Sequence, residues 1–70
     1  MNRKPVESSN IAAVGYDADE QVLEVEFRSG GVYQYHGVPE NVFQQLLYAS
    51  SKGRFFHQNI KGRYGWTSIA

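Results

Sequence analysis

The chain has 70 residues, which is enough for one small domain and too few for two. Seven basic and seven acidic residues give a net charge of zero, which argues against strong unspecific binding to nucleic acid. The lack of cysteine excludes disulfides and thiolate metal sites. The charges are unevenly placed: residues 5–27 hold six acidic residues and no basic one, while residues 41–70 hold four basic residues and no acidic one. The C-terminal half could therefore make a local phosphate contact.

Three strands are predicted in the N-terminal half of the chain. Residues 1–8 are polar and contain a proline, which predicts a flexible tail. Residues 11–16 and residues 22–27 predict two strands joined by an aspartate-rich turn. Residues 32–36 predict a third strand after a glycine pair. Because both connections are short, we expect a three-stranded antiparallel meander.

The register of the second hairpin decides which face of the sheet carries Tyr33 and Tyr35. A three-residue loop, residues 29–31, would place Phe27 opposite Tyr33 and Gly31 at the left-handed bulge position. Both tyrosines would then share the apolar face, whereas a loop one residue shorter or longer would turn them onto the glutamate face. We prefer the first register, which favours tyrosines in the core or at its rim. If that face is open, the tyrosines instead form a stacking platform.

Two helices are predicted after the strands. Pro39 suits the first turn of a helix, and the apolar residues that follow it at helical spacing should lie over the sheet. One of the two serines at residues 50–51 can cap a second, shorter helix. Residues 65–70 form a tail, in which Trp66 either folds back or remains free. The expected fold is therefore α+β, with a three-stranded antiparallel β-meander followed by one long and one short α-helix packed on one face.

The sequence contains no strong catalytic or metal-binding pattern. His36 and His57 lie on different predicted elements without the spacing of a metal motif, and the C-terminal half has no carboxylate to complete a zinc site. There is no nucleophile elbow and no phosphate loop, and the pair Gly30-Gly31 fits a hairpin turn. We therefore expect a protein that is not an enzyme and that has no catalytic residues, no metal and no cofactor.

Residues 51–64 interleave basic, aromatic and amide side chains, a combination typical of single-strand nucleic-acid binding. The alternative is a helix whose apolar residues are buried and whose charges are merely solvated. Phe55 distinguishes the two interpretations, because Phe55 and Phe56 cannot sit equally well on one helix face. The candidate residues for binding nucleic acid or another partner are Tyr33, Tyr35, Lys52, Arg54, Phe55, His57, Lys61 and Arg63.

An ordered set of short motifs resembles the KTSC family. The set comprises Ser8-Ser9, Ile11, Gly15-Tyr16-Asp17, Leu23-Glu24-Val25-Glu26-Phe27, Gly30-Gly31, Tyr33-x-Tyr35, Val38-Pro39, Ser51-Lys52-Gly53, Phe56 and Ile60. This small domain is named for the C-terminus of some lysyl-tRNA synthetases and also occurs as a stand-alone protein. The resemblance implies a domain at residues 9–64 between tails at residues 1–8 and 65–70. It also implies an RNA-related role, proposed from the synthetase context, and it assigns no catalytic residues.

We therefore expect a small non-catalytic binding module in RNA or transcription biology. The first hypothesis is binding of RNA or single-stranded nucleic acid through the basic aromatic segment. The alternative is a protein-binding regulator, of the kind that phages encode, which acts on a nucleic-acid machine such as RNA polymerase or the ribosome through a charged surface or an edge strand. A third hypothesis is self-association through strand edges or Trp66, although a monomer is expected. Without a signal peptide or a membrane span of about 20 apolar residues, we expect a cytoplasmic protein, in the host cytoplasm if it is phage-encoded.

Overall fold

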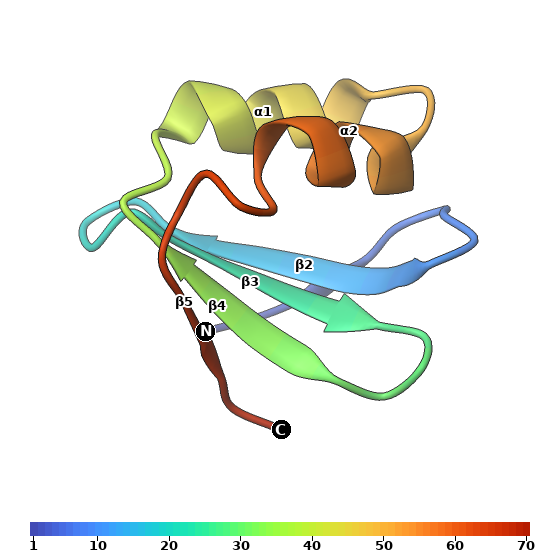
Figure 1. Ribbon diagram of the computed structural model, residues 1–70, viewed down its shortest axis with the longest axis horizontal. Helices are drawn as coiled ribbons and strands as arrows, with labels where there is room; N and C mark the ends of the chain where they lie inside the picture. Colours follow the sequence, from blue (N-terminus) through green and yellow to red (C-terminus); the bar gives the residue numbers. More distant parts are fainter.

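Five strands form one antiparallel sheet in the order β1-β2-β3-β4-β5, and two helices lie together on one of its faces (Figure 1). The structure is a computed structural model that describes residues 1–70. Its elements are β1 (Lys4–Pro5), β2 (Ile11–Asp17), β3 (Val22–Phe27), β4 (Val32–His36), α1 (Glu40–Tyr48), α2 (Lys52–Asn59) and β5 (Trp66–Ser68). The α+β class, the three central strands and the presence of two helices on one face are confirmed, but the expected long and short helices have nearly the same length, nine and eight residues.

The predicted number of strands was wrong, because the sheet contains two more. Both additional strands come from segments that the sequence analysis interpreted as tails. β1 pairs with β2, with Lys4 opposite Val14, and β5 pairs with β4, with Trp66 opposite Tyr35. Both strands are short and all their side chains are exposed, so they show no apolar alternation by which a strand is recognised. The predicted meander is therefore the centre of a wider sheet.

The hairpin between β3 and β4 has the expected three-residue loop, but the loop begins one residue earlier. The N–H of Phe27 donates to the carbonyl of Gly31 at 2.8 Å, and the N–H of Gly30 donates to the carbonyl of Phe27 at 2.9 Å. The loop is therefore residues 28–30, and Gly30, with φ of 111°, takes the left-handed position that we had assigned to Gly31. Gly31 is needed for space, since a Cβ there would lie 2.9 Å from the Tyr33 ring.

This shift changes the cross-strand pairs but leaves the side chains of β3 and β4 on their predicted faces, whereas Arg28, expected on the glutamate face, lies in the loop and lines the groove. Val25 lies opposite Tyr33 and Leu23 lies opposite Tyr35, so the expected pairing of Phe27 with Tyr33 was wrong. The pairing differs by two residues, and side chains two apart on a strand point to the same face. Both tyrosines therefore share the helix-covered face with the apolar residues of β3, as the alternation predicts.

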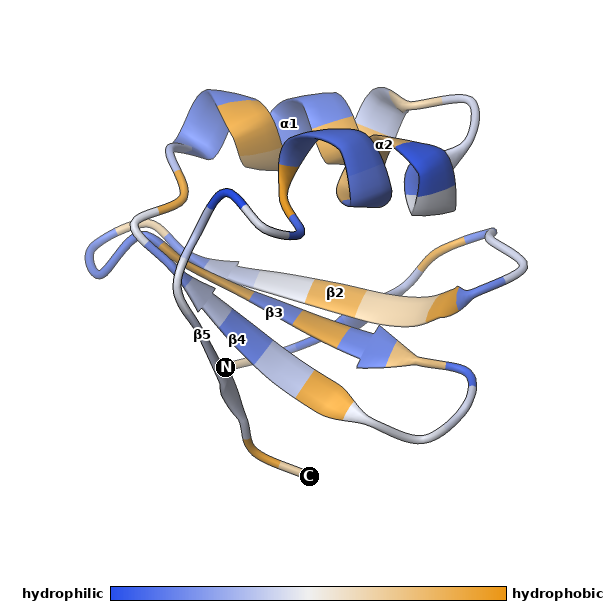
Figure 2. Cartoon of the chain, in the orientation of Figure 1, coloured by the Kyte–Doolittle hydropathy of each residue, from blue (hydrophilic) through white to orange (hydrophobic).

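The core lies between this face of the sheet and the two helices, where Figure 2 shows the hydrophobic residues of β2 and β3 beneath α1 and α2. Tyr16 stacks on Phe43 of α1 with 4.8 Å between ring centroids, and its hydroxyl donates to the carbonyl of Val38. Burial raises the pKa of the Tyr16 hydroxyl. The buried cluster consists of Ile11, Val14, Leu23, Val25, Tyr35, Val38, Leu46, Phe56 and Ile60.

Local signals explain where the two helices begin. Pro39 is the N-cap of α1, one position before the first turn in which it was expected, and Glu40 follows it near the positive end of the helix dipole. Ser51 caps α2, as predicted for one of the two serines, because its hydroxyl accepts a hydrogen bond from the N–H of Arg54 at 3.3 Å. Neither helix is long and apolar enough to cross a membrane.

The opposite face of the sheet carries a polar network around Glu24, which is only 3% exposed. Gln34 donates to Oε1 of Glu24 at 2.8 Å, while Arg3 forms an ion pair with Glu24 and donates through Nε to Oε1 of Glu26 at 3.1 Å. Burial alone would raise the pKa of Glu24, but the hydrogen bonds from Gln34 and Arg3 outweigh burial and lower it. The network therefore ties the N-terminal segment to β3 and β4.

Candidate functional site

A groove with a volume of about 560 Å³ lies among four parts of the chain. These are α2, the β3–β4 hairpin, strand β5 and the residues just before β2. Its volume lies within the range of about 300–1,000 Å³ that is usual for small-molecule sites. Both helices lie on one face of the sheet (Figure 1), and α2 packs on β3 and β4 through the contacts of Phe56 with Phe27 and Tyr35. The lining of the groove combines aromatic, cationic and uncharged polar side chains.

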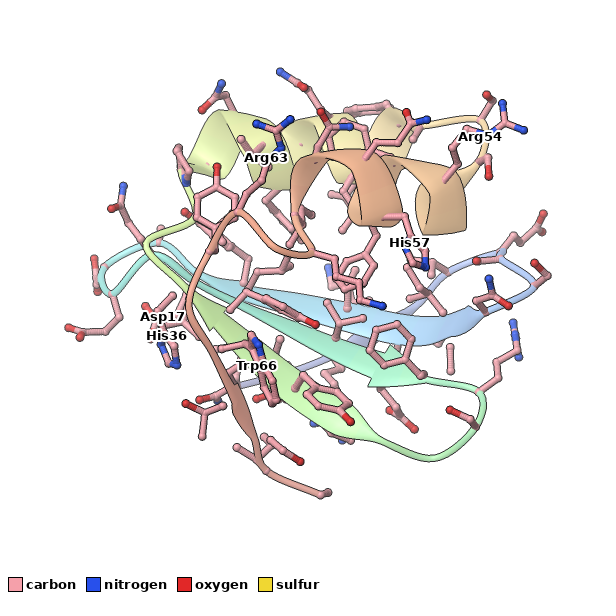
Figure 3. All side chains as sticks on the ribbon, in the orientation of Figure 1. Asp17, His36, Arg54, His57, Arg63 and Trp66 are labelled. Carbon is pink, nitrogen blue, oxygen red and sulfur yellow. The ribbon has the colours of Figure 1, made fainter.

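Aromatic rings form much of the groove wall. Phe27 makes edge-to-face contacts with Tyr33, at 5.8 Å between centroids, and with Phe56, at 5.4 Å. Tyr33 in turn contacts Trp66 at 5.5 Å, and Tyr35 contacts Phe56 at 5.2 Å, both also edge to face. These contacts hold the rings in fixed orientations. Trp66 nevertheless remains 59% exposed, and Figure 3 shows its side chain extending from β5 over β4, where a planar ligand could stack.

Tyr35 differs from the other rings because almost all of it is buried. It is 5% exposed, and its hydroxyl makes no hydrogen bond within the protein, whereas the Tyr16 hydroxyl does. No fully buried side-chain oxygen or nitrogen lacks a partner, so the Tyr35 hydroxyl keeps contact with solvent, and the residue lines the groove. Burial, and to a lesser extent Tyr33, raises the pKa of the Tyr35 hydroxyl. At neutral pH it therefore stays protonated and can both donate and accept a hydrogen bond.

Three side chains that carry or can acquire positive charge line the groove, and no carboxylate does. Arg28 donates through Nε to the carbonyl of Ser8 at 2.7 Å, which anchors the guanidinium and leaves its terminal amino groups without a partner in the protein. The side chains of His57 and Lys61 form neither a hydrogen bond nor an ion pair, and Figure 3 shows His57 pointing from α2 toward the sheet. Arg3, on the opposite face, is the one basic residue in an ion pair. The groove is therefore electropositive and favours anions.

The structure brings together some of the predicted site residues from separate elements. Two come from β4 and two come from α2 and the turn after it. Those that line the groove are Tyr33, Tyr35, His57 and Lys61. The sequence left open whether Tyr33 and Tyr35 are core residues or an exposed platform. Tyr35 belongs to the buried core, and half-buried Tyr33 packs at its rim. Both nonetheless contribute to the groove wall.

The other four predicted site residues lie outside the groove. Lys52 donates from Nζ to the carbonyl of Ala49 at 3.2 Å, so it closes the turn between the helices. Arg54 and Arg63 are exposed and lie at separate places on the helical side (Figure 3). Phe55 is half-buried and packs against the core, which gives it a structural role. No group of three or more His, Cys, Asp or Glu side chains could hold a metal ion.

Three important groove residues were missed by the sequence analysis. Trp66 enters the groove through the unpredicted strand β5, and Arg28 enters it through the displaced hairpin loop. Asn10 lies against α2, where a Cβ on Gly53 would be 3.3 Å from the Asn10 amide nitrogen. The available signal was the single tryptophan of the chain in the C-terminal tail, because an aromatic residue of that size is often placed on a surface that functions in binding.

A comparison with known proteins places this arrangement in a family. The family model of the KTSC domain matches residues 7–64. The chain belongs to the KTSC domain family. The crystal structure of a KTSC domain protein from Yersinia pestis matches this structure with a TM-score of 0.96 at 49% sequence identity, covering 99% of this chain and 97% of that one. The resemblance drawn from the short motifs is confirmed.

KTSC relatives occur in two contexts. An uncharacterized protein from Stutzerimonas stutzeri is 47% identical over 64 residues, which span 91% of this chain and 90% of that protein. A lysine–tRNA ligase from Nostoc sp. is 41% identical over 64 residues, which span 91% of this chain but 11% of the ligase. The same small domain is thus found both as nearly a whole protein and as one segment of a much larger enzyme.

Proposed function

We propose that this KTSC domain is a non-catalytic module that binds single-stranded RNA in the groove beside β4 and β5. The observation that carries the proposal is the lining of the groove, which combines an open aromatic surface with unpaired cations and has no carboxylate. Exposed aromatic rings stack on unpaired bases for about 1–3 kcal/mol per base, and basic side chains hold the phosphates between them. Trp66 and Tyr33 would serve the first role, and Arg28 and Lys61 the second.

The distribution of charge supports a one-sided approach to RNA. The net charge is zero, so attraction cannot come from the molecule as a whole. The acidic network around Glu24 lies on the opposite face of the sheet from the groove, and it holds Arg3 there. In this proposal a monomeric domain in the cytoplasm presents its groove face to the strand. The occurrence of the domain in lysine–tRNA ligases, which are named for an RNA substrate, adds support.

The fluorescence of Trp66, the single tryptophan, provides a direct test. We expect a short single-stranded RNA to quench this fluorescence as the base stacks on the indole ring. Binding should weaken with salt, and the logarithm of the binding constant should fall by about 0.7 per contacted phosphate for each unit of log salt concentration. An unchanged emission spectrum at low salt, confirmed by fluorescence anisotropy of labelled RNA that does not change, would rule out the proposal.

Matched substitutions sharpen this test. Arg28→Ala and Lys61→Ala each remove one groove cation, and each should weaken binding and reduce the salt dependence by about one phosphate contact. Arg54→Ala and Arg63→Ala remove the same charge outside the groove, so they should have a smaller effect. If all four variants weaken binding equally, attraction comes from general charge and the groove is not the site.

A protein partner is the second candidate, and strand β5 favours it. β5 is the last strand of the sheet and its three side chains are exposed, so its outer edge is available for pairing with a strand of another protein. A regulator of a nucleic-acid machine such as RNA polymerase or the ribosome could use this edge. Co-purification of such a machine after nuclease treatment would support this candidate, whereas recovery that requires RNA would count against it.

A further inference from the structure

We propose that the groove recognises one unpaired nucleobase through the hydroxyl of Tyr35, so that the domain prefers one base at one position of a bound RNA strand. This inference rests on the proposed function and extends it from strand binding to base selection. Stacking and phosphate contacts tolerate any base, whereas a directed hydrogen bond to the edge of a base does not. The question is therefore whether the groove contains a fixed polar group that a base could satisfy.

The Tyr35 side chain meets this requirement. Its ring belongs to the buried core, is 5% exposed and packs edge to face on Phe56 at 5.2 Å. In the sheet it lies opposite Leu23, which is fully buried. The ring therefore cannot turn away to seek another partner, and the position of its hydroxyl is fixed by core packing. That hydroxyl has no hydrogen-bond partner in the protein and keeps contact with solvent, and the residue lines the groove.

The unpaired hydroxyl of Tyr35, next to buried surface, can discriminate between bases. A base whose edge satisfies the hydroxyl gains a hydrogen bond, whereas a base that covers the hydroxyl without satisfying it leaves a desolvated polar group unpaired. The penalty against the wrong base is therefore larger than the gain from the right one, which is the usual source of sharp discrimination. The hydroxyl can present either its proton or its lone pairs to the base.

Asn10 is a second groove residue with unused hydrogen-bonding groups. Its side-chain amide makes no hydrogen bond within the protein and lies against Gly53 at the start of α2. A carboxamide offers a donor and an acceptor side by side, which is the arrangement that reads base edges elsewhere. Because the wall carries cations and no carboxylate, it suits a nucleotide with its phosphate better than a cationic ligand.

The test compares four RNA strands of equal length that differ only in the central base. Affinities are measured by fluorescence anisotropy for the wild-type protein, Tyr35→Phe and Tyr33→Phe. We expect the wild type to prefer one base by about tenfold, which is the effect of one hydrogen bond gained or lost. Tyr35→Phe keeps the ring and removes only the oxygen, so it should bind with the same salt dependence but without the preference. Tyr33→Phe, at a half-buried ring, should keep the preference.

The outcomes separate this inference from the proposed function. If all four strands bind the wild type equally, the base-selection inference is wrong and strand binding stands. If none binds, both proposals are wrong. If Tyr35→Phe retains the full preference, Tyr35 does not read the base. Asn10→Ala provides an independent variant at an exposed side chain, and it should reduce the preference for the same base even if Tyr35→Phe proves unstable.

Discussion

At the scale of single residues, the buried carboxylate of Glu24 is the clearest case in which charge stabilises this fold. Its pKa is lowered below the ordinary value of 4.5 because hydrogen bonds from Gln34 and Arg3 outweigh the cost of burial. A carboxyl whose pKa is lower in the folded state contributes stability above its unfolded pKa, and this contribution is lost as the pH falls through the folded pKa. The loss therefore belongs to the acidic range below about pH 4.5.

The buried carboxylate of Glu24 predicts a specific loss of stability in Glu24→Gln. The variant should lose about 1–3 kcal/mol of unfolding free energy at neutral pH, because it removes the charged carboxylate that accepts hydrogen bonds from Arg3 and Gln34. It should also show a smaller fall in stability below pH 4.5 than the wild type. Urea denaturation across the pH range measures both effects, and Glu20→Gln, at an exposed carboxyl, is the matched control. Parallel pH curves for Glu24→Gln and the wild type would contradict the assignment.

Gly30 shows how one residue determines the hairpin. With φ of 111° it lies in the left-handed region, where a side chain is strained although nothing lies within 4 Å of the Cβ position. Gly30→Ala should therefore lower the unfolding free energy by about 1–2 kcal/mol, measured by chemical denaturation. Gly65→Ala has the same open space without the positive φ and should be nearly neutral. Equal effects of the two substitutions would show that the hairpin does not depend on this conformation.

At the scale of elements, the sequence predicts those parts of the fold whose side chains carry a pattern. β3 is found from its strict apolar alternation, and α2 from its serine cap. β1 and β5 expose every side chain, so only backbone pairing defines them and no residue pattern reveals them. The hairpin loop was displaced by one residue because Gly30 and Gly31 are equally suited to a left-handed position in sequence, and only the Tyr33 ring distinguishes them.

The candidate site was predicted in part for the same reason. Tyr33, Tyr35 and His57 belong to elements that the pattern identifies, Lys61 follows α2 in the next turn, and the packing of α2 on the sheet brings all four to one groove. Trp66 and Asn10 reach that groove from segments whose position depends on long-range pairing. The interleaved charges of residues 51–64 spread around α2, so Arg54 and Arg63 point away from the residues with which they were grouped. Residues that are neighbours in the segment 51–64 therefore do not form one continuous surface.

The packing of α2 predicts different roles for its two adjacent phenylalanines. Phe56 is 4% exposed and contacts the rings of Phe27 and Tyr35, whereas Phe55 is half-buried at the edge of the core. Phe56→Ala should cost about 3–5 kcal/mol, a large part of the stability of a domain of this size. Phe55→Ala should cost clearly less. Thermal or urea unfolding of both variants measures the difference, and an equal loss would show that α2 is rotated so that both rings are buried equally.

At the scale of the whole molecule, the sheet separates two surfaces of different chemistry. One face holds the network of Arg3, Glu24 and Glu26, and the other carries the aromatic, electropositive groove. A total charge of zero conceals this division, which appears only when the strands place alternate side chains on opposite faces. The central claim is that the groove face of this KTSC domain binds single-stranded RNA.

The most direct test is an amide NMR titration of the labelled protein with a short single-stranded RNA at low and at physiological salt. We expect shifts that cluster at Arg28, Tyr33, His57, Lys61 and Trp66 and that diminish as salt is raised. Residues of the opposite face, such as Glu26, should not shift. An unchanged spectrum, or shifts confined to the surface around Arg54, would contradict the claim and direct attention to a protein partner at the edge of β5.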